Sequence, residues 1–185
     1  MIQLGGNVLL MEKLIKYLSK EDFDKLIKAE KYKKYKLIYS LGFCSGLRIS
    51  EIVGYKLNGI WRIKPLESNQ VDLITHQIKI IGGKGLKDRI TVIPPNFTEE
   101  HLKLLPIKIP RRTVQYHFTK LAMKILGKKM SIHTLRHGFG NYMINEKNVP
   151  MPMVQQLMGH SRIDTTGLYA KANPKKSIER AWDSF

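Results

Sequence analysis

Apolar residues recur every three to four positions in several stretches of the chain, and two short runs between them are rich in β-branched residues. The first pattern is that of amphipathic helices and the second that of strands. Helices are predicted to begin at Ser19, near Ser50 and at His133, and to cover residues 33–43, 98–105, 111–126, 151–158, 161–169 and 174–185. Residues 77–81 and 89–93 flank a glycine-rich turn and are predicted to form a β-hairpin. The expected fold class is α+β, mainly helical, with a small hairpin sheet.

Single residues mark the ends of several elements. Ser19 opens a capping-box-like Ser-Lys-Glu-Asp, and Gly127 follows the last apolar position of a long helical pattern. Ile125 and Met153 belong to apolar helical patterns and are expected to pack in the core. Residues 54–75 follow neither period, so they are interpreted as an irregular connection that includes a strand.

The chain has 185 residues, the size of one domain that can bury a core of its own. Residues 1–18 are expected to form an N-terminal extension, and residues 19–185 one domain that includes the tail helix 174–185. No apolar run is long enough for a membrane span, and no basic segment precedes the apolar residues near Met1 as in a signal peptide. The single cysteine, Cys44, allows no internal disulfide and favours a reducing, cytoplasmic location.

The balance of charge is strongly positive. The chain carries 32 Lys and Arg against 15 Asp and Glu, a net charge of +17. Residues 101–185 hold 15 basic and 4 acidic side chains, which is most of the surplus. A positive surplus concentrated in one part of a chain favours a polyanionic partner, and nucleic acid is the commonest. On charge alone, the alternative is a lysine-rich protein without such a partner.

Residues 131–171 contain four side chains suited to phosphate chemistry. His133 and Arg136 are three positions apart at a predicted helix start, so both lie on one face of a turn and can converge on one anion. His160 follows a Met-Gly pair, and Tyr169 comes nine residues later, near the end of another predicted helix. A permanently charged guanidinium, two imidazoles and a phenol in one segment favour a site for a phosphate group.

A zinc site is the other interpretation of the histidines. His133 and His137 are four residues apart, the spacing of two zinc ligands on one helix face. The helical zinc motif also needs a glutamate directly after the first histidine, where this chain has Thr134. We therefore expect neither a metal ion nor a cofactor.

Three motifs in this segment resemble the catalytic end of the tyrosine recombinase (phage integrase) family, and the resemblance implies an Xer-like member of archaeal or archaeal-virus type. They are His-x-Leu-Arg-His, Leu-Met-Gly-His-Ser and Thr-Thr-x-x-Tyr. The family pattern has a further arginine and lysine upstream, and both are matched, in Gly-Leu-Arg-Ile-Ser-Glu around Arg48 and in Gly-Lys-Gly around Lys84. The resemblance covers about residues 19–169.

The resemblance implies a site-specific recombinase or integrase that cleaves and rejoins DNA through a 3′-phosphotyrosyl intermediate, without metal or nucleotide. It implies catalytic roles for six residues, namely Arg48, Lys84, His133, Arg136, His160 and Tyr169. In this scheme Tyr169 attacks the phosphate, and Lys84 protonates the departing 5′ oxygen. His133 acts as a base or as a positioning group. The two arginines and His160 stabilise the charge that develops on the phosphate.

Two assignments in this scheme have alternatives. Arg48 is expected among apolar neighbours, where it needs an anionic partner. Glu51 can be that partner in a purely structural role, whereas the resemblance favours a phosphate. Lys87 competes with Lys84 for the lysine role, and the spacing of 36 residues between Arg48 and Lys84 is wider than in compact bacterial relatives, which indicates an insertion.

The expected partner is double-stranded DNA. Four further basic residues are expected to contact it, namely Lys87, Arg111, Arg112 and Arg162. In the family the tail helix often docks on a neighbouring protomer, which implies a dimer or tetramer on DNA. Fewer than 20 residues precede Ser19, so no separate core-binding domain is expected in this chain, and a second protein is a candidate for clamping the DNA. The chain is expected to be nucleoid-associated and encoded by a virus or another mobile element.

Three other functions fit parts of the same pattern. A type IB topoisomerase-like enzyme uses the same chemistry to relax supercoils without producing recombinants. A noncatalytic or partner-dependent relic binds DNA without forming a covalent adduct. A metal-dependent nuclease loses its activity when a chelator is added.

Overall fold

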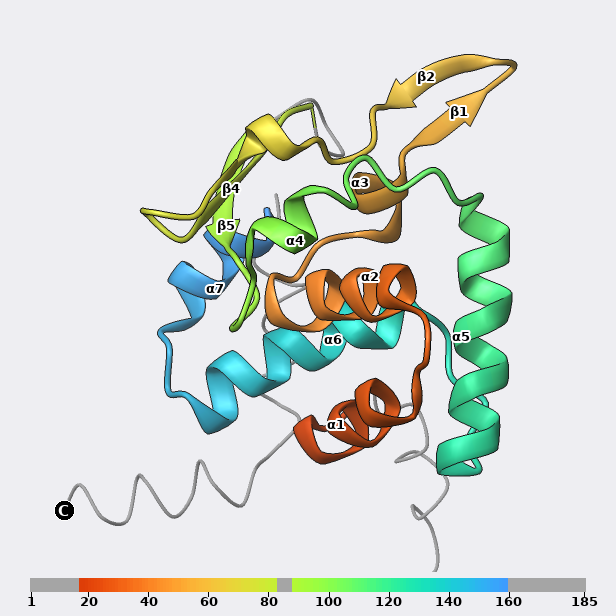
Figure 1. Cartoon of the computed structure of the whole chain (residues 1–185). Coiled ribbons are helices and arrows are strands. Elements are labelled where there is room, and N and C mark those ends of the chain that lie inside the picture. The colour runs from red at the N-terminus through yellow and green to blue at the C-terminus, as the bar shows by residue number, and fades with distance from the viewer. Residues whose placement is uncertain (1–16, 83–87, 160–185) are drawn as a thin grey trace, which may run out of the picture.

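Helices form most of the molecule, and two small antiparallel sheets lie at one end (Figure 1). The computed structural model describes residues 17–82 and 88–159. The helices are α1 (Lys20–Ala29), α2 (Lys33–Cys44), α3 (Ile49–Val53), α4 (Glu99–Leu102), α5 (Arg111–Leu126), α6 (His133–Asn141) and α7 (Met151–Met158), with a 3-10 turn η2 (Ser68–Gln70) and a π-helical turn η3 (Tyr142–Glu146). The strands are β1 (Tyr55–Leu57), β2 (Ile60–Ile63), β3 (Val71–Asp72), β4 (Gln77–Ile80) and β5 (Arg89–Val92). The α+β class is confirmed.

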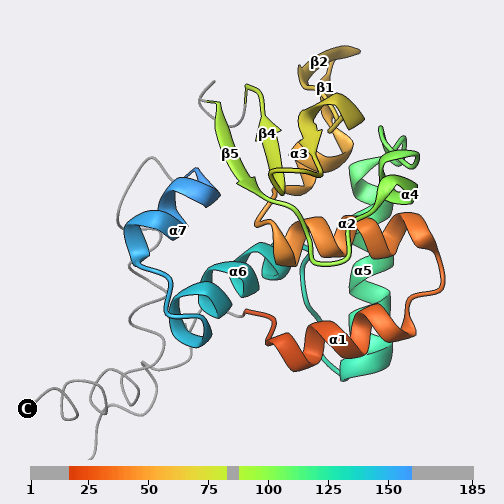
Figure 2. The same cartoon turned by 60° about the vertical axis from the view of Figure 1, so that its left-hand side comes forward.

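The core is built around α2, which is surrounded by α1, α5 and α6 (Figures 1 and 2). Leu37, Ile38 and Tyr39 of α2 are buried almost completely. Helix α6 packs closely on α2 because Gly138 has no side chain: a Cβ at this position would lie 2.6 Å from the ring of Phe43 and 2.5 Å from the carbonyl oxygen of Leu18. The position of α6, and with it of the candidate site, therefore depends on this close approach.

Among residues 17–82 and 88–159, the predicted helix starts and ends agree closely with those observed, whereas the predicted helices 161–169 and 174–185 lie outside the described residues. Ser19 caps α1, and its Oγ accepts a hydrogen bond from the Asp22 amide at 3.1 Å. Helix α5 ends at Gly127, whose φ of 64° is left-handed and whose amide donates to the Met123 carbonyl. Helix α4 is shorter than the predicted 98–105 segment. The described part of the chain contains no helix that is both long and apolar enough to cross a membrane.

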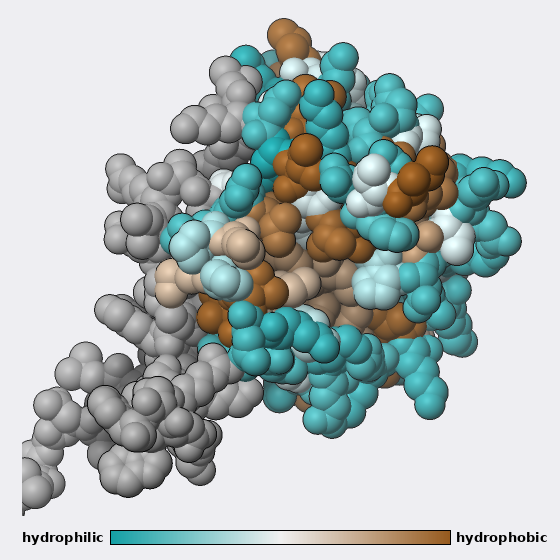
Figure 3. All heavy atoms as spheres, turned by 90° about the vertical axis from the view of Figure 1, so that its left-hand side faces the viewer, coloured by the Kyte–Doolittle hydropathy of each residue, from teal (hydrophilic) through white to brown (hydrophobic). Residues whose placement is uncertain are grey.

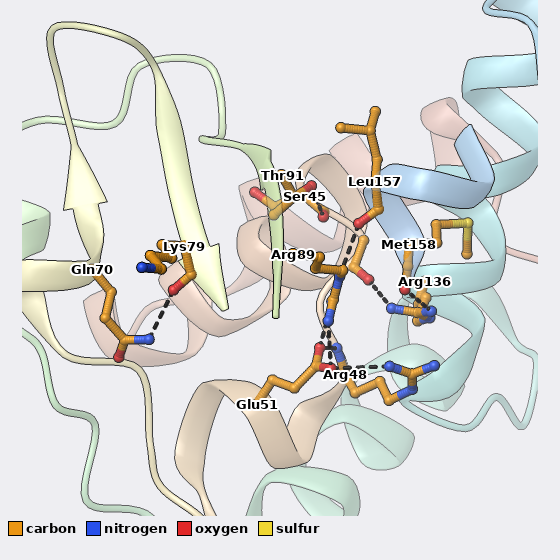
Figure 4. Close-up of polar contacts among 11 residues, drawn as sticks. Ser45, Arg48, Glu51, Gln70, Lys79, Arg89, Thr91, Arg136, Leu157 and Met158 are labelled. Carbon is orange, nitrogen blue, oxygen red and sulfur yellow. Dashed lines mark hydrogen bonds and ion pairs between the residues drawn. The ribbon is translucent and has the colours of Figure 1, made fainter. Parts of the chain in front are cut away.

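The predicted hairpin is present as β4 and β5, which pair antiparallel with Gln77 opposite Val92 and Ile80 opposite Arg89. Strand β3 pairs with the other edge of β4, which makes a three-stranded sheet. Ile78 and Ile80 point from β4 into the core. The sheet therefore places Arg89, the first residue of β5, next to the start of α3 (Figure 4).

Residues 54–75 are more regular than predicted. They contain the two-stranded β1–β2 hairpin, then η2 and β3. Asn58 and Gly59 form its turn with φ values of 51° and 78°. Trp61 and Ile60 are 44% and 63% exposed, so neither strand has the buried alternating face on which strand prediction depends. The Asn-Gly pair was the available signal for this hairpin.

Two predictions about the core are wrong. Ile125 is 36% exposed because it lies in the last turn of α5, beyond the buried row formed by Val114, Phe118 and Ala122. Met153 is 57% exposed because α7 buries only the side that carries Val154 and Met158. Met153 and the exposed Ile90 line a cavity of about 810 Å³ between α7 and β5. Figure 3 shows this face of the molecule, with hydrophobic residues gathered at its centre and hydrophilic residues around them.

Candidate active site

Three arginines from separate parts of the chain meet beside one carboxylate (Figure 4). Arg48 precedes α3, Arg89 begins β5, and Arg136 lies in the first turns of α6. The carboxylate is that of Glu51 on α3. Thr91 of β5 donates a buried hydrogen bond of 2.8 Å to the Ser45 carbonyl, which fixes the loop before Arg48 against the sheet. The sheet and the helices therefore hold these residues in one place.

Glu51 binds two of the arginines. Its carboxylate accepts hydrogen bonds from Arg89 Nη1 and Nη2, both at 2.8 Å, and from Arg48 Nη1 at 3.0 Å. It also accepts from the Arg48 amide at 2.7 Å. Burial alone would raise the pKa of Glu51, but the hydrogen bonds and charge of Arg89, the Arg48 amide and the charge of Arg136 outweigh burial and lower it to about 2. Glu51 is therefore ionised at neutral pH and acts as a counter-ion inside a cationic cluster.

Arg136 connects α6 with two backbone segments. Its Nη1 donates to the Gly46 carbonyl and its Nη2 to the Met158 carbonyl. Gly46 has a φ of 65°, and a Cβ there would lie 2.6 Å from the ring of Phe139, so glycine is required for this close packing. The guanidinium is thus oriented before any ligand arrives, and only 7% of the residue is exposed.

The C-terminal end of α7 is held by the same cluster. Arg89 Nε donates to the Leu157 carbonyl at 2.9 Å, and Arg136 binds the Met158 carbonyl. The last carbonyls of a helix have no partner within it, and the partial negative charge at a helix C-terminus stabilises nearby cations. Gly159 ends α7 with a φ of 65°, and a Cβ there would lie 2.6 Å from Arg89 Cδ. The chain therefore leaves α7 directly beside the arginines.

His133 is the first residue of α6 and faces the same positive charges. Partial burial, followed by the charges of Arg111, Arg136 and Arg48, lowers the pKa of His133 below its usual value. The pKa of His137 is also lowered, by burial and then by the charges of His133 and Arg136. His133 is therefore neutral at physiological pH and has a ring nitrogen that can accept a proton.

The structure brings together part of the predicted site. Arg48 and Arg136 lie in one cluster (Figure 4), and their charges act on His133, as does the charge of Arg111 at the start of α5. Arg112 follows on the same helix and is exposed. Five predicted residues lie outside the described residues, namely Lys84, Lys87, His160, Arg162 and Tyr169. Arg48 pairs with Glu51 at 3.0 Å, which is the structural alternative that the sequence offered, and its role in binding a phosphate stays a prediction.

Arg89 is the residue of this cluster that the sequence analysis missed. Its side chain is 7% exposed and forms an ion pair of 2.8 Å with Glu51, 38 positions earlier in the chain. An arginine at the first position of a β-branched strand was the available signal, because a buried guanidinium needs an anion. That signal does not indicate which anion.

The cluster is suited to bind an anion. Arg48 is the most accessible of the three arginines, with 21% of its side chain exposed, and His133, on whose ring its charge acts, is partly exposed. One buried carboxylate faces three guanidinium groups, so an excess of positive charge remains for a ligand. Among residues 17–82 and 88–159, no three His, Cys, Asp or Glu side chains are grouped so as to hold a metal ion.

Comparison with known proteins identifies relatives. The sequence model of the Phage integrase family matches residues 16–176. Tyrosine recombinase XerA of Pyrococcus furiosus is 30% identical over 190 residues, which cover 91% of this chain and 62% of the relative. XerA of Thermococcus kodakarensis is 29% identical over 191 residues, which cover 91% of this chain and 63% of the relative. The chain thus spans less than two thirds of the length of these relatives.

Solved structures share the fold. The crystal structure of XerA recombinase has a TM-score of 0.68 at 24% identity, with 91% of this chain and 65% of the other covered. The catalytic domain of bacteriophage HP1 integrase has a TM-score of 0.61 at 21% identity, with 90% and 93% covered. The resemblance inferred from the motifs is therefore confirmed by a match over most of the sequence and by a shared fold. The chain belongs to the phage integrase family.

Proposed function

We propose that this chain is the catalytic domain of a site-specific tyrosine recombinase, which breaks and rejoins DNA without a metal ion. The observation that carries the proposal is the cluster of Arg48, Arg89 and Arg136 around Glu51, with neutral His133 at its edge. A phosphodiester has two nonbridging oxygens, which can accept hydrogen bonds from the guanidinium groups of such a cluster. The family match supplies the reaction class.

Two arginines stabilise the reacting phosphate in this mechanism. In-line attack places additional negative charge on the nonbridging oxygens, and donors that are already oriented stabilise that charge most as it develops. Arg48 is accessible and held by Glu51 on one side, so its remaining donors are available to the phosphate. Arg136 supplies a second, nearly buried charge whose orientation is set by the Gly46 and Met158 carbonyls.

The covalent steps use residues carried over from the family motifs. Tyr169 Oη attacks the phosphorus, the bond to the 5′ oxygen breaks, and a 3′-phosphotyrosyl bond forms. Lys84 gives a proton to the departing 5′ oxygen, with Lys87 as the alternative donor. His133, neutral because of its lowered pKa, accepts the phenolic proton or positions the phosphate. His160 adds a further donor to the nonbridging oxygens, and a 5′ hydroxyl reverses the steps to reseal the strand.

The partner in this proposal is duplex DNA, bound by an oligomer of the chain. The XerH recombinase structure, with a TM-score of 0.64, contains that protein bound to its difH substrate, and the lambda integrase structure, with a TM-score of 0.60, contains a dimer of that protein bound to a core site. A net charge of +17 supports binding to a polyanion. Arg111, Arg112, Lys87 and Arg162 would contact backbone phosphates. A separate clamping protein, a cytoplasmic location on the nucleoid, and a viral or other mobile-element gene belong to the same proposal.

The test is a covalent-trapping assay with chelator present. The protein is incubated with nicked DNA that carries candidate attachment sequences, and the products are separated on a denaturing gel. We expect a slowly migrating adduct with the unmodified chain and none with Tyr169→Phe. Arg48→Ala should form the adduct about 100-fold more slowly, the usual order for loss of one charge-stabilising donor.

Each other outcome points to a different function. DNA binding without any adduct would indicate a relic or a domain that needs its partner. Cleavage that the chelator abolishes would indicate a metal-dependent nuclease. An adduct accompanied by relaxation of supercoils but no recombinants would indicate a topoisomerase-like enzyme.

A further inference from the structure

The β1–β2 hairpin projects from the body of the molecule, beside the segment that leads into α5 (Figures 1 and 2). Between the hairpin base and residues 106–112 lies a cavity of about 650 Å³. Its lining includes two aromatic and four basic side chains, namely Tyr55, Trp61, Lys56, Lys108, Arg111 and Arg112. Among its described lining residues there is no Asp or Glu. This cavity combines apolar walls with an uncompensated positive rim.

The cations of this cavity lack acidic partners in the described part of the chain, although two of them contact rings. Lys56 Nζ lies 4.5 Å from the centroid of the Trp61 ring, and the Arg111 guanidinium lies 4.7 Å from that of Tyr55. Such contacts stabilise a cation without neutralising it. Trp61 remains 44% exposed although it packs against Gly54, where a Cβ would lie 2.4 Å from the indole. The ring is therefore both anchored and available for contact.

Size and chemistry together favour one kind of ligand. Cavities of about 300–1,000 Å³ enclose small molecules, so a space of this volume accepts one or two bases and excludes a double helix. Bases stack on exposed aromatic side chains, and basic side chains track the phosphates of a single strand. If the ligand were an apolar small molecule, the four basic side chains in the described lining would have no negatively charged group to bind.

The cavity adjoins the candidate active site through Arg111. This residue stacks on Tyr55 in the cavity wall, and its charge also acts on His133 in the cluster. A DNA strand bound at the cluster can therefore continue into the cavity. In the proposed reaction the cleaved strand carries a free 5′ hydroxyl and has to leave its complement before it joins another strand, so unpaired nucleotides arise next to the cleavage point.

We propose that this cavity binds single-stranded DNA, with an unpaired base stacked on Trp61 and its phosphates at the basic rim. The site holds the nucleotides that unpair beside the cleavage point during strand exchange. This inference rests on the proposed function for its biological role, whereas the binding itself can be measured without any cleavage.

The experiment uses Trp61 fluorescence. The chain has two tryptophans, so Trp182→Phe leaves Trp61 as the one reporter. Titration with an eight-nucleotide oligothymidylate at low salt should quench this fluorescence, and a duplex of the same length should quench it much less. In a polarisation assay with labelled oligothymidylate, Trp61→Ala should weaken binding at least fivefold and Trp61→Phe much less, because phenylalanine still stacks.

Two charge variants control for unspecific electrostatic attraction. Lys108→Gln removes one exposed charge at the cavity rim, and Lys28→Gln removes one exposed charge on α1, at the opposite end of the molecule (Figures 1 and 2). Lys108→Gln should weaken binding of the oligothymidylate about threefold or more, with Lys28→Gln close to the unmodified chain. Equal losses in both variants would show unspecific attraction and overturn the proposal. Equal quenching by single strand and duplex would overturn it as well.

The two proposals can fail separately. A chain that forms the Tyr169 adduct but does not bind oligothymidylate at Trp61 would refute the cavity proposal and leave the recombinase proposal intact. If the chain binds oligothymidylate at Trp61 but never forms an adduct, the proposed reaction is refuted and the proposal of a single-strand binding site is supported.

Discussion

At the scale of single residues, the candidate site depends on where one negative charge lies. The Glu51 side chain is only 1% exposed, yet it is ionised because Arg89 and Arg48 bind it from two directions. Without this carboxylate, two guanidinium groups would lie close together with no counter-ion, which is unfavourable in a poorly hydrated place. Glu51 therefore determines both the stability of the cluster and the orientation of Arg48.

Glu51 should make stability depend on pH under acidic conditions. Its pKa falls from an ordinary 4.5 to about 2 on folding, so between these values the unfolded chain binds more protons than the folded one. The stabilisation is complete above about pH 4.5 and is lost as the pH falls towards 2. At roughly 1.4 kcal/mol per pKa unit it amounts to about 3 kcal/mol. Urea unfolding at pH 5 and pH 3 measures the part of this loss that occurs above pH 3, which is about 2 kcal/mol.

Two variants test the assignment to Glu51. The glutamine in Glu51→Gln cannot titrate, so the stability of this variant, although lower at pH 5, should change less between pH 5 and pH 3 than that of the unmodified chain. Asp24→Asn removes an exposed carboxylate that is 58% accessible and should behave like the unmodified chain. An equal loss between the two pH values in Glu51→Gln and the unmodified chain would contradict the assignment.

His133 provides a second prediction at the residue scale. Partial burial and then the positive charges around the ring favour its neutral form, so its pKa in the DNA-free protein should lie below the ordinary 6.5. Arg111→Gln removes the charge that acts most strongly on the ring and should raise that pKa. Titration of the ring carbon protons by NMR measures both values. A midpoint that stays the same in Arg111→Gln would show that Arg111 does not face His133.

At the scale of elements, the site depends on how closely α6 approaches α2. Helix α6 carries both His133 and Arg136, and the approach is possible because Gly138 lies against Phe43 and the Leu18 carbonyl. The carbonyl belongs to the backbone just before α1, so it cannot move aside as the end of a flexible side chain can. A small shift of α6 would therefore separate Arg136 from Gly46 and Met158.

Gly138→Ala should destabilise the fold although alanine is the better helix former. Helix propensity alone predicts a gain of about 1 kcal/mol, whereas the added Cβ would meet the Leu18 oxygen at 2.5 Å. We expect a net loss of roughly 1–3 kcal/mol, as for other overpacked cores, measured by urea unfolding. Gly42→Ala is the matched control, because its Cβ would meet only the Leu135 side chain, at 3.1 Å or more. A gain in stability with Gly138→Ala would contradict the packing described.

At the scale of the whole molecule, separate segments contribute positive charge to one region. The cluster around Glu51 and the cavity beneath the β1–β2 hairpin share Arg111 at their border. The hairpin, residues 55–63, lies between Arg48 and the Gly-Lys-Gly turn in the chain. In the proposed function, a DNA strand would run along this region from the reacting phosphate to the stacking surface of Trp61.

Local patterns in the sequence determined most of the helices. The bounds of α5 and α7 agree with the predicted 111–126 and 151–158, because apolar spacing and the glycines that follow are properties of neighbouring residues. The β4–β5 hairpin was predicted for the same reason. The family motifs could also be recognised without a structure, since they are short runs of residues. The sequence alone therefore indicated the fold class, the family, and Arg48, His133 and Arg136 as parts of one site.

Tertiary structure decided how those residues are held. The bond between Arg89 and Glu51 joins positions 38 residues apart, and Arg136 binds carbonyls 90 residues earlier and 22 residues later. No local pattern specifies such pairs, because they arise only when the sheet and α6 pack around α2. The cavity at Trp61 likewise exists only where the hairpin meets residues 106–112. Periodicity follows from the geometry of one element, whereas a site made by several elements depends on their packing.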